Sequence, residues 1–507
     1  MAVNQLKAGA FLSYVSIGLN NLVGLLYIPF MLRMMGQNEY GLYALVASVI
    51  AYLTVLDLGF GNAIVRYTAK FRAEGKMTEQ YDMFGMFLLL YSLIGLIAFL
   101  IGLGLYFNVN ALFDRSMTAE DLDKIRIMML LMTLNLAFTF PLSIFGSIIT
   151  AYEDFVFQKL VNIVRIILNP LVMIILLLMG YRAIGMVVVT TLFNIATLLV
   201  NCWYCFHRIH IRICLGRFQW GFLKEVSIYS FWIFLNAIMD RIYWSTGQFI
   251  LGIYKGAATV AVYAVAIQLQ GIYMSFSTAI SGVFLPRVTA MVTKENNEKA
   301  ISDLFIRTGR IQYIVMAFML TGFILFGRPF IHLWAGTDYD EAYYIALLFF
   351  VPLTVPLIQN LGITILQARN QMRFRSLLYV VIALVSLGIS IPMARLYGGI
   401  GCALGIAFAL VCGQIIAMNI YYHKRIHIEI IRFWIEIAKM SPIPLGLGII
   451  FYFFLRCIPL DTVWQLGLGI VVFTVIYIPL FWFMGMNQYE RDLFSAPVKK
   501  ILGKCFR

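Results

Sequence analysis

The stretch IYSFWIFLNAIMDRIYWSTGQFILGIY, residues 228–254, is apolar and long enough to cross a bilayer as a helix. Asp240 and Arg241 lie side by side near its middle. A charged side chain at the centre of a membrane-spanning helix costs roughly 2.5–3.5 kcal/mol on insertion scales, so it persists where it faces a bundle interior or a watery cavity. Such residues commonly mark the path of a substrate or an ion. The stretch therefore predicts a membrane transporter for a polar, charged substrate.

The composition of the whole chain is typical of helical membrane proteins. Its 507 residues are 62% hydrophobic and 12% charged, whereas soluble domains carry about 25% charged residues. Apolar stretches of about 20 residues recur along the entire length. We therefore expect an all-α polytopic membrane protein with fourteen transmembrane helices, at 8–33, 40–70, 81–107, 125–150, 159–180, 183–206, 226–253, 258–290, 304–331, 341–367, 374–396, 399–422, 433–457 and 462–485.

The positions of Lys and Arg predict the orientation of these helices. One set of loops is rich in basic residues, as at 70–76, 208–224 and 369–375, and the opposite loops are short and poor in them. Basic loops face the cytoplasm, so we predict a multi-pass protein of the inner (cytoplasmic) membrane with both termini in the cytoplasm. The net charge of +14 is spread over such loops, where lipid headgroups rather than nucleic acid are the expected partner.

Short sequence matches indicate an internal repeat. GQNEYGLYA at 36–44 resembles GAATVAVYA at 256–264, and Gly146 matches Gly362 at nearly the same offset. Because six spans separate the matches, the two halves have the same orientation, as in transporters whose parallel repeats are related by an axis along the membrane normal. We predict two six-helix lobes around a central cleft, followed by two extra helices. The predicted domains are an N-lobe at 1–210, a C-lobe at 211–427, and 428–507 with spans 13 and 14 and a basic cytoplasmic tail.

One segment of the second span resembles a known family. LDLGFGNAIVRY at 56–67 is similar to the characteristic segment of polysaccharide-biosynthesis flippases of the Wzx type, and Asp240-Arg241 followed by YAVA at 263–266 is similar to the matching segment of their second lobe. These flippases share a superfamily with multidrug exporters and the lipid II flippase. The resemblance implies transfer of an undecaprenyl-diphosphate-linked oligosaccharide from the cytoplasmic to the outer leaflet by alternating access, for O-antigen, capsule or exopolysaccharide biosynthesis. It also implies polysaccharide polymerases and glycosyltransferases as partners.

Five charged residues within predicted spans are the candidate site. The resemblance implies that Arg66 and Arg241 face the diphosphate or acidic sugars, and Arg165 in span 5 extends the same track. Arginine suits this role because its planar guanidinium stays protonated and binds phosphate in a bidentate manner. Asp57 and Asp240 are candidates for ion coupling or gating, with a proton or sodium ion. Alternatively, these carboxylates are fixed ties between helices.

Prolines within spans are candidate hinges. Pro141 and Pro356 lie one residue from equivalence in the repeat, and each removes a helix hydrogen bond and can kink its helix. A matched pair of hinges and a pair of static kinks are both consistent with this pattern. Arg310, near the cytoplasmic end of its span, is expected to extend its head to the membrane surface.

Several kinds of chemistry have no motif in this chain. It contains no Gly-x-x-x-x-Gly-Lys-Ser/Thr loop, and Cys202-x-x-Cys205 would need further ligands to bind zinc. We therefore expect no enzyme activity, no metal site and no cofactor apart from a coupling ion. Two alternatives stay open. Export of organic cations would favour an acidic cavity, and a polysaccharide polymerase would require a sizeable outer loop with catalytic carboxylates.

Overall fold

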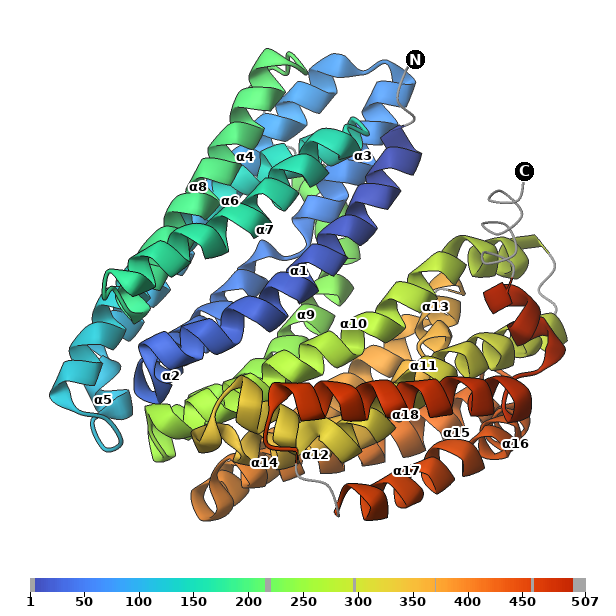
Figure 1. Cartoon of the computed structure of the whole chain (residues 1–507). Helices are drawn as coiled ribbons and strands as arrows, with labels where there is room; N and C mark the ends of the chain where they lie inside the picture. Colours follow the sequence, from blue (N-terminus) through green and yellow to red (C-terminus); the bar gives the residue numbers. More distant parts are fainter. Residues whose placement is uncertain (1–4, 215–219, 295–297, 370, 457–459, 496–507) are drawn as a thin grey trace, which may run out of the picture. The chain divides into compact units, whose positions relative to one another are not determined.

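The computed structural model describes residues 5–214, 220–294, 298–369, 371–456 and 460–495. All regular secondary structure within these ranges is helical (Figure 1), which confirms the predicted all-α class. The chain divides into two compact units, Met1–Ala264 with Ile391–Cys402 and Val265–Ser390 with Ala403–Arg507. Each unit consists of two separate stretches of chain, and the boundaries between the units fall inside long helices.

The first unit is a bundle of long helices joined by short turns. Its elements are α1 (Gln5–Met35), α2 (Gln37–Leu53), the 3-10 turn η1 (Thr54–Asp57), α3 (Phe60–Glu74), α4 (Met77–Phe107), α5 (Val109–Phe113), α6 (Ala119–Ala151), α7 (Phe155–Leu178), α8 (Ala183–His207), α9 (Trp220–Tyr254), the beginning of α10 (Ala257–Lys294) and Ile391–Cys402 of α14. Helix α6 packs along both α4 and α8, α1 packs along α7, and α2 packs along α9.

The second unit continues the helical pattern. Its elements are the rest of α10, α11 (Glu298–Trp334), the 3-10 turn η2 (Thr337–Tyr339), α12 (Glu341–Ile358), α13 (Leu361–Ala368), most of α14 (Met372–Ala409), the π-helical segment η3 (Leu410–Ala417), α15 (Met418–Lys424), α16 (Ile430–Met440), α17 (Pro442–Leu455) and α18 (Val463–Met484). Helix α11 is its centre, because α12, α16, α17 and α18 all pack against it.

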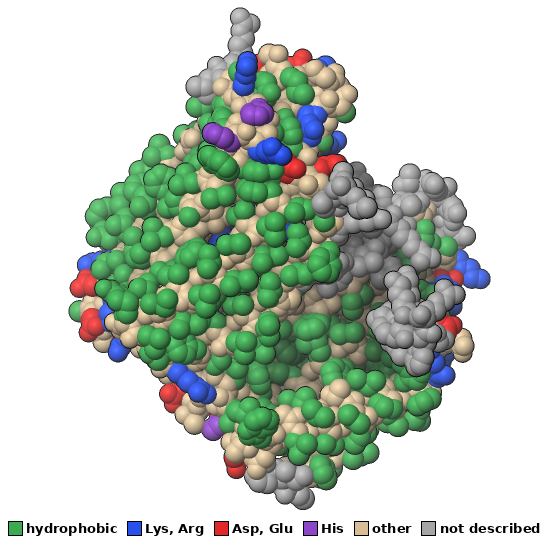
Figure 2. Space-filling view, turned by 45° about the horizontal axis from the view of Figure 1, so that its top comes forward, with side chains coloured by type: hydrophobic (Ala, Val, Ile, Leu, Met, Phe, Trp, Pro, Cys, Tyr) green, Lys and Arg blue, Asp and Glu red, His purple; other side chains and the backbone are tan. Residues whose placement is uncertain are grey.

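The surface of these helices is suited to lipid rather than water. On α4, Leu89, Leu93, Leu96 and Leu100 follow helical spacing along one face, and each is at least half exposed. Figure 2 shows hydrophobic side chains over most of the visible face and charged side chains near its edges. Soluble proteins rarely expose continuous apolar surfaces of this size. The chain is therefore a multi-pass membrane protein.

The helices of the structure give a different set of candidate membrane-spanning segments from the sequence. Twelve segments of the described residues are long and apolar enough to cross a membrane, so the predicted count of fourteen is not confirmed. The predicted span 226–253 is helical, as α9, but is not among the twelve. The predicted spans 374–396 and 399–422 fall in one segment, Met372–Lys424. A non-helical residue, Gly398, breaks that segment where the two predicted spans meet.

An apolar cluster packs α17 and α18, which follow the predicted repeat, against α11. Phe473, Tyr477 and Phe481 of α18 are almost fully buried, and they pack with Phe326 of α11 and Phe451 of α17. Aromatic side chains of this kind bury large areas and carry much of the stabilisation of a core. The extra helices are therefore integral to the second unit.

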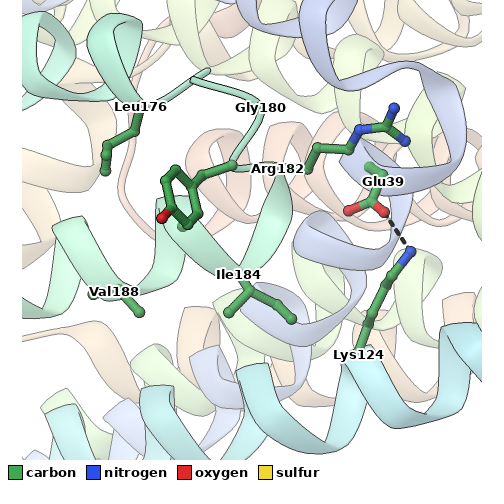
Figure 3. Close-up of a pocket in the computed structure, with 9 residues that line it drawn as sticks. Glu39, Lys124, Leu176, Gly180, Arg182, Ile184 and Val188 are labelled. Carbon is green, nitrogen blue, oxygen red and sulfur yellow. Dashed lines mark hydrogen bonds and ion pairs between the residues drawn. The ribbon is translucent and has the colours of Figure 1, made fainter. Parts of the chain in front are cut away.

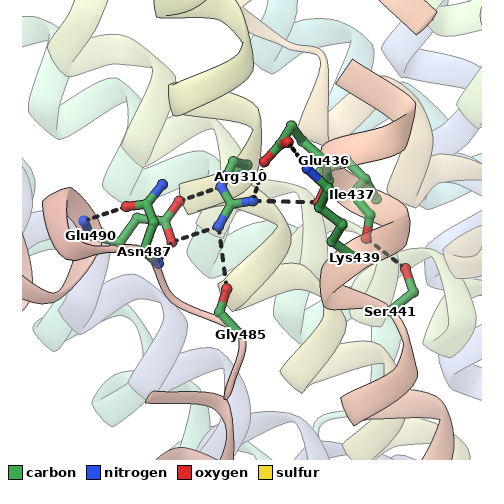
Figure 4. Close-up of polar contacts among 8 residues, drawn as sticks. All are labelled: Arg310, Glu436, Ile437, Lys439, Ser441, Gly485, Asn487 and Glu490. Atoms are coloured by element: carbon green, nitrogen blue, oxygen red, sulfur yellow. Dashed lines mark hydrogen bonds and ion pairs between the residues drawn. The ribbon is translucent and has the colours of Figure 1, made fainter. Parts of the chain in front are cut away.

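Arg310 of α11 is fixed within a polar network, and the expectation that it extends to the membrane surface is wrong. Its guanidinium donates to both carboxylate oxygens of Glu490, at 2.6 and 3.0 Å, and to Glu436 Oε2 at 2.8 Å. It also reaches the carbonyl oxygens of Glu436 and Gly485 (Figure 4). Only 5% of Arg310 and 1% of Glu490 are exposed. The network joins α11 to α16 and to the segment after α18.

Candidate functional site

The sequence predicted one continuous span at 40–70, but the structure divides this stretch into separate helices. Helix α2 ends at Leu53, η1 follows, and α3 begins at Phe60. Between them Leu58 (φ 54°) and Gly59 (φ 72°) adopt left-handed conformations. Glycine takes this conformation without strain, whereas a branched side chain such as Leu58 is held there at a cost of about 1–3 kcal/mol. The break falls within the LDLGFG sequence of the family-like segment.

Asp57 is the last residue of η1 and is held at this break. The Tyr91 hydroxyl of α4 donates a hydrogen bond of 2.7 Å to Asp57 Oδ1, and the backbone N–H of Gly59 also donates to the carboxylate. Tyr91 is fully buried and stacks on Phe140 of α6. Asp57 thus makes an interhelical tie through a tyrosine. Non-helical backbone at membrane depth occurs where protein covers it or where it lines a watery cavity.

Replacing Tyr91 with phenylalanine is expected to loosen this break. The half-buried Asp57 carboxylate would lose a hydrogen bond to a charged group, which is worth about 1.5–3 kcal/mol. The temperature of unfolding of the purified protein measures the effect. Tyr106→Phe on the same helix is the matched control, since no hydrogen bond joins that hydroxyl to a described residue. Equal stability of the two variants would show that Tyr91 does not hold Asp57.

Helix α9 brings the second pair of charges to the same part of the first unit. It packs against α2, η1 and α3, and the Tyr52 and Thr246 hydroxyls form a hydrogen bond between α2 and α9. Asp240 and Arg241 are exposed on α9. Elements in direct contact therefore carry Asp57, Arg66, Asp240 and Arg241, which the sequence had placed in two different lobes.

The three candidate arginines have different surroundings. Arg66 of α3 is exposed, and its guanidinium carbon lies 5.7 Å from the Tyr67 ring centroid, within cation–π range. The side chain of Arg241 forms no hydrogen bond or ion pair with any residue that the structure describes. Arg165 of α7 is half-buried and likewise lacks such a contact in the described part of the chain. Because α7 packs mainly against α1 and α8, Arg165 is not brought beside the other two by extensive helix packing.

Glycines allow close backbone contact at one end of this unit. A Cβ atom at Gly41 of α2 would overlap the backbone carbonyl of Ala257, at the start of α10. The Ser116 hydroxyl donates to the Gly252 carbonyl of α9 at 2.6 Å, and Gly252 lies against Leu45 of α2. Residues on both sides of the predicted lobe boundary at 210 are therefore in contact within one unit.

A methyl group at Gly41 is expected to open this contact. In Gly41→Ala the added Cβ has no room beside the Ala257 carbonyl, which is backbone and cannot turn aside. We expect a several-fold rise in the rate at which a membrane-impermeant maleimide labels a cysteine introduced at Ser116, in a background without the native cysteines.

The control for this experiment is Gly104→Ala in α4, where a Cβ meets nothing within 4 Å. It should leave the rate of labelling unchanged. If Gly41→Ala also labels at the parent rate, then the contact between Gly41 and Ala257 does not close this end.

The two candidate hinge prolines differ in their surroundings. Pro141 lies inside the continuous helix α6, and the Ala137 carbonyl that it leaves without a helical partner faces Gly95 of α4. Pro356 lies two residues before the end of α12. The helix is interrupted at Gln359, and α13 begins at Leu361. Their role as hinges stays a prediction, but only Pro356 lies next to a break.

Sequence reasoning missed a buried polar group around this second break. Gln359 Nε2 donates to Asn419 Oδ1 at 2.9 Å, and Trp434 Nε1 of α16 donates to the same oxygen at 3.0 Å. Asn360 Nδ2 donates to the Ser281 hydroxyl of α10 at 2.9 Å. The π-helical segment η3 precedes Asn419, and π-helical turns are frequent at functional sites. Gln359, Asn360 and Asn419 are amides within predicted spans, and this position was the signal that could have found them.

A pocket of about 550 Å³ lies in the first unit where α2 and α6 begin and α7 turns into α8 (Figure 3). Glu39, which is 5% exposed, accepts from Lys124 Nζ at 2.6 Å and from the backbone N–H of Ala183 at 3.3 Å. Asn38 donates to Asp121 Oδ1 at 2.8 Å, and Asp121 caps the start of α6 with Thr118. Glu39, within the repeat sequence GQNEYGLYA, therefore joins α2, α6 and α8.

Comparison with known proteins identifies the family. Residues 6–292, more than half of the chain, match the family model described as polysaccharide biosynthesis protein. The chain belongs to this family. No curated protein matches it at a significant level.

This member of the polysaccharide biosynthesis family shares its fold with solved structures of transporters. The lipid II flippase MurJ in an inward closed conformation matches with a TM-score of 0.70 and 16% identity, covering 93% of this chain and 99% of the MurJ chain. An inward-facing multidrug resistance MATE transporter of the MOP superfamily matches with a TM-score of 0.61 and 14% identity, covering 80% and 94%. A MOP superfamily transporter from Pyrococcus furiosus matches with a TM-score of 0.53 and 14% identity, covering 86% and 94%. These likenesses establish the fold.

Proposed function

We propose that this protein is a flippase that moves an undecaprenyl-diphosphate-linked oligosaccharide from the cytoplasmic to the outer leaflet, for cell-surface polysaccharide such as O-antigen, capsule or exopolysaccharide. The observation that carries the proposal is Arg241. It is an exposed cation on α9, within a stretch predicted to cross the membrane, and no described residue neutralises it. Membership of the polysaccharide biosynthesis family and a fold like that of a lipid II flippase support the same reading.

The chemistry of the substrate explains why such a cation is required. A lipid diphosphate carries about two negative charges, and transfer of an unpaired charge into hydrocarbon costs several kcal/mol or more. A guanidinium lowers this cost through two parallel charge-assisted hydrogen bonds to phosphate. In the proposed mechanism Arg241 binds the diphosphate, Arg66 on the adjoining α3 receives it from the cytoplasmic side, and Arg165 on α7 extends the cationic surface.

The proposed cycle alternates access to this site between the two leaflets. The close contacts of α2 with the end of α9 and the start of α10 support a state in which access from the non-cytoplasmic side, as predicted from the basic loops, is restricted. The break at Leu58 and Gly59 allows α3 to move while α2 keeps its packing. Asp57 and Asp240 are the proposed coupling or gating carboxylates, with a proton or sodium as the ion. In this proposal both termini lie in the cytoplasm, on the side where glycosyltransferases would make the substrate.

Export of organic cations is the second candidate function. The fold likeness to a multidrug MATE transporter favours it, as do two carboxylates on packed helices. Such a substrate would be repelled by Arg66 and Arg241, so this function requires both arginines to be dispensable.

Translocation in proteoliposomes tests the proposal. Purified protein is reconstituted with a lipid-linked oligosaccharide, and its accessibility to a glycan-cleaving enzyme outside the vesicle is followed over time. Protein-dependent transfer is the expected result. If no lipid-linked glycan moves while a fluorescent organic cation is exported from the same vesicles, the drug-exporter function replaces the flippase.

A further inference from the structure

The pocket at the α7–α8 turn has an available positive charge. The Glu39 carboxylate is occupied by Lys124 and by the N–H of Ala183, and Lys124 also pairs with Glu120 at 2.7 Å. The side chain of Arg182, which also lines the pocket, is exposed and forms no hydrogen bond or ion pair with the residues that the structure describes. The charge that this pocket offers to a ligand is therefore that of a guanidinium.

The opposite wall of the pocket is apolar and continues into the lipid-facing surface. Figure 3 shows Leu176 and Val188 across the pocket from Arg182, Glu39 and Lys124. Beyond this wall, Leu178 and Met179 at the end of α7 are 65% and 66% exposed. A ligand that satisfies both sides has an anionic head and a hydrocarbon body.

The size and position of the pocket narrow the choice of ligand. A volume of about 550 Å³ lies in the range of about 300–1,000 Å³ that is usual for small-molecule sites. It holds a phosphate headgroup with its first methylene groups rather than a whole lipid. The positions of the basic loops predict that the turn at 179–182 faces the outer leaflet, so the ligand is expected to come from that leaflet.

We propose that this pocket binds the phosphate headgroup of an anionic phospholipid of the outer leaflet, with Arg182 on the phosphate and Leu176, Ile184 and Val188 along the acyl chain. The bound lipid would brace the junction at which Glu39 already joins α2, α6 and α8. This site is separate from Arg241, and the proposal does not depend on the transported substrate.

Native mass spectrometry of the full chain in detergent tests this proposal, with phosphatidylglycerol and phosphatidylcholine as probes. Wild type should retain phosphatidylglycerol in preference to phosphatidylcholine. Arg182→Gln should weaken phosphatidylglycerol binding about fivefold, the effect of one basic group near an anionic lipid, and leave phosphatidylcholine unchanged. Val188→Trp, which fills the apolar side, should weaken both lipids.

The matched control is Arg115→Gln, which removes the same charge from an exposed outer residue that does not line the pocket. It should bind phosphatidylglycerol as wild type does. Equal loss in both arginine variants, or no loss in Arg182→Gln, would overturn the proposal. Undecaprenyl phosphate is the third probe, and if it displaces phosphatidylglycerol at lower concentration in an Arg182-dependent way, the polyprenyl carrier rather than a phospholipid is the ligand.

Discussion

Arg241→Ala is expected to slow the transfer of lipid-linked oligosaccharide in proteoliposomes by about two orders of magnitude while the protein keeps its helical fold. A charge-assisted hydrogen bond contributes about 1.5–3 kcal/mol, so loss of a bidentate contact costs about 3 kcal/mol or more. At a factor of ten for every 1.4 kcal/mol, transfer should slow roughly 150-fold. The fold should survive because no described residue depends on the Arg241 guanidinium for a hydrogen bond or ion pair. Circular dichroism and gel filtration check that condition.

Two further variants separate charge from geometry at this position. Arg241→Lys keeps the positive charge but loses the planar fork, so it should retain intermediate transfer activity. Arg115→Ala removes an exposed arginine elsewhere on the chain and should transfer at the wild-type rate. Wild-type transfer by Arg241→Ala, in vesicles where transfer depends on the protein, would show that Arg241 is not a substrate contact.

Arg310→Met is expected to have the largest effect on stability of any single substitution considered. It would leave the carboxylate of Glu490 buried at 1% exposure without its cation. Breaking a buried ion pair from one side costs about 3–5 kcal/mol. For a unit of this size such a loss corresponds to a fall of roughly 10 °C in the temperature of unfolding. Thermal unfolding in detergent, followed by gel filtration of heated samples, measures it.

Arg432→Gln is the matched control for Arg310→Met. Arg432 also pairs with two carboxylates, Asp303 at 2.7 Å and Glu429 at 2.9 Å, but its side chain is half exposed. Exposed ion pairs contribute about 0.2–1 kcal/mol, so the control should unfold close to the wild-type temperature. Equal losses from both substitutions would mean that burial does not strengthen the Arg310 network.

The helical class and most span boundaries could be predicted because they depend on local hydropathy. The break at Gly398 falls between two predicted spans for this reason. The family-like segment was also visible in the sequence, but its conformation was not. A leucine in the left-handed region, as at Leu58, is set by the surrounding packing and has no sequence signal.

Side-chain partners far apart in the sequence were beyond prediction for a related reason. Nothing near Arg310 indicates that a carboxylate 180 residues later will bind it, so the surface position was the reasonable expectation. The sequence likewise gives no sign that Tyr91, within an apolar span, donates a hydrogen bond to Asp57, which lies 34 residues earlier. The candidate arginines were identified from their cost in lipid, and their roles stay predictions.

The distance in sequence between Arg310 and Glu490 sets an order for the biogenesis of this protein. Translation proceeds at about 5–20 residues per second, so α11 emerges roughly 10–40 s before its main acidic partner exists. Until Glu490 has been synthesised, the five N–H donors of the Arg310 guanidinium lack this carboxylate as a hydrogen-bond acceptor. The segment after α18 therefore completes the packing of a helix made much earlier. A chain that ends before residue 490 would lack the carboxylate that fixes Arg310.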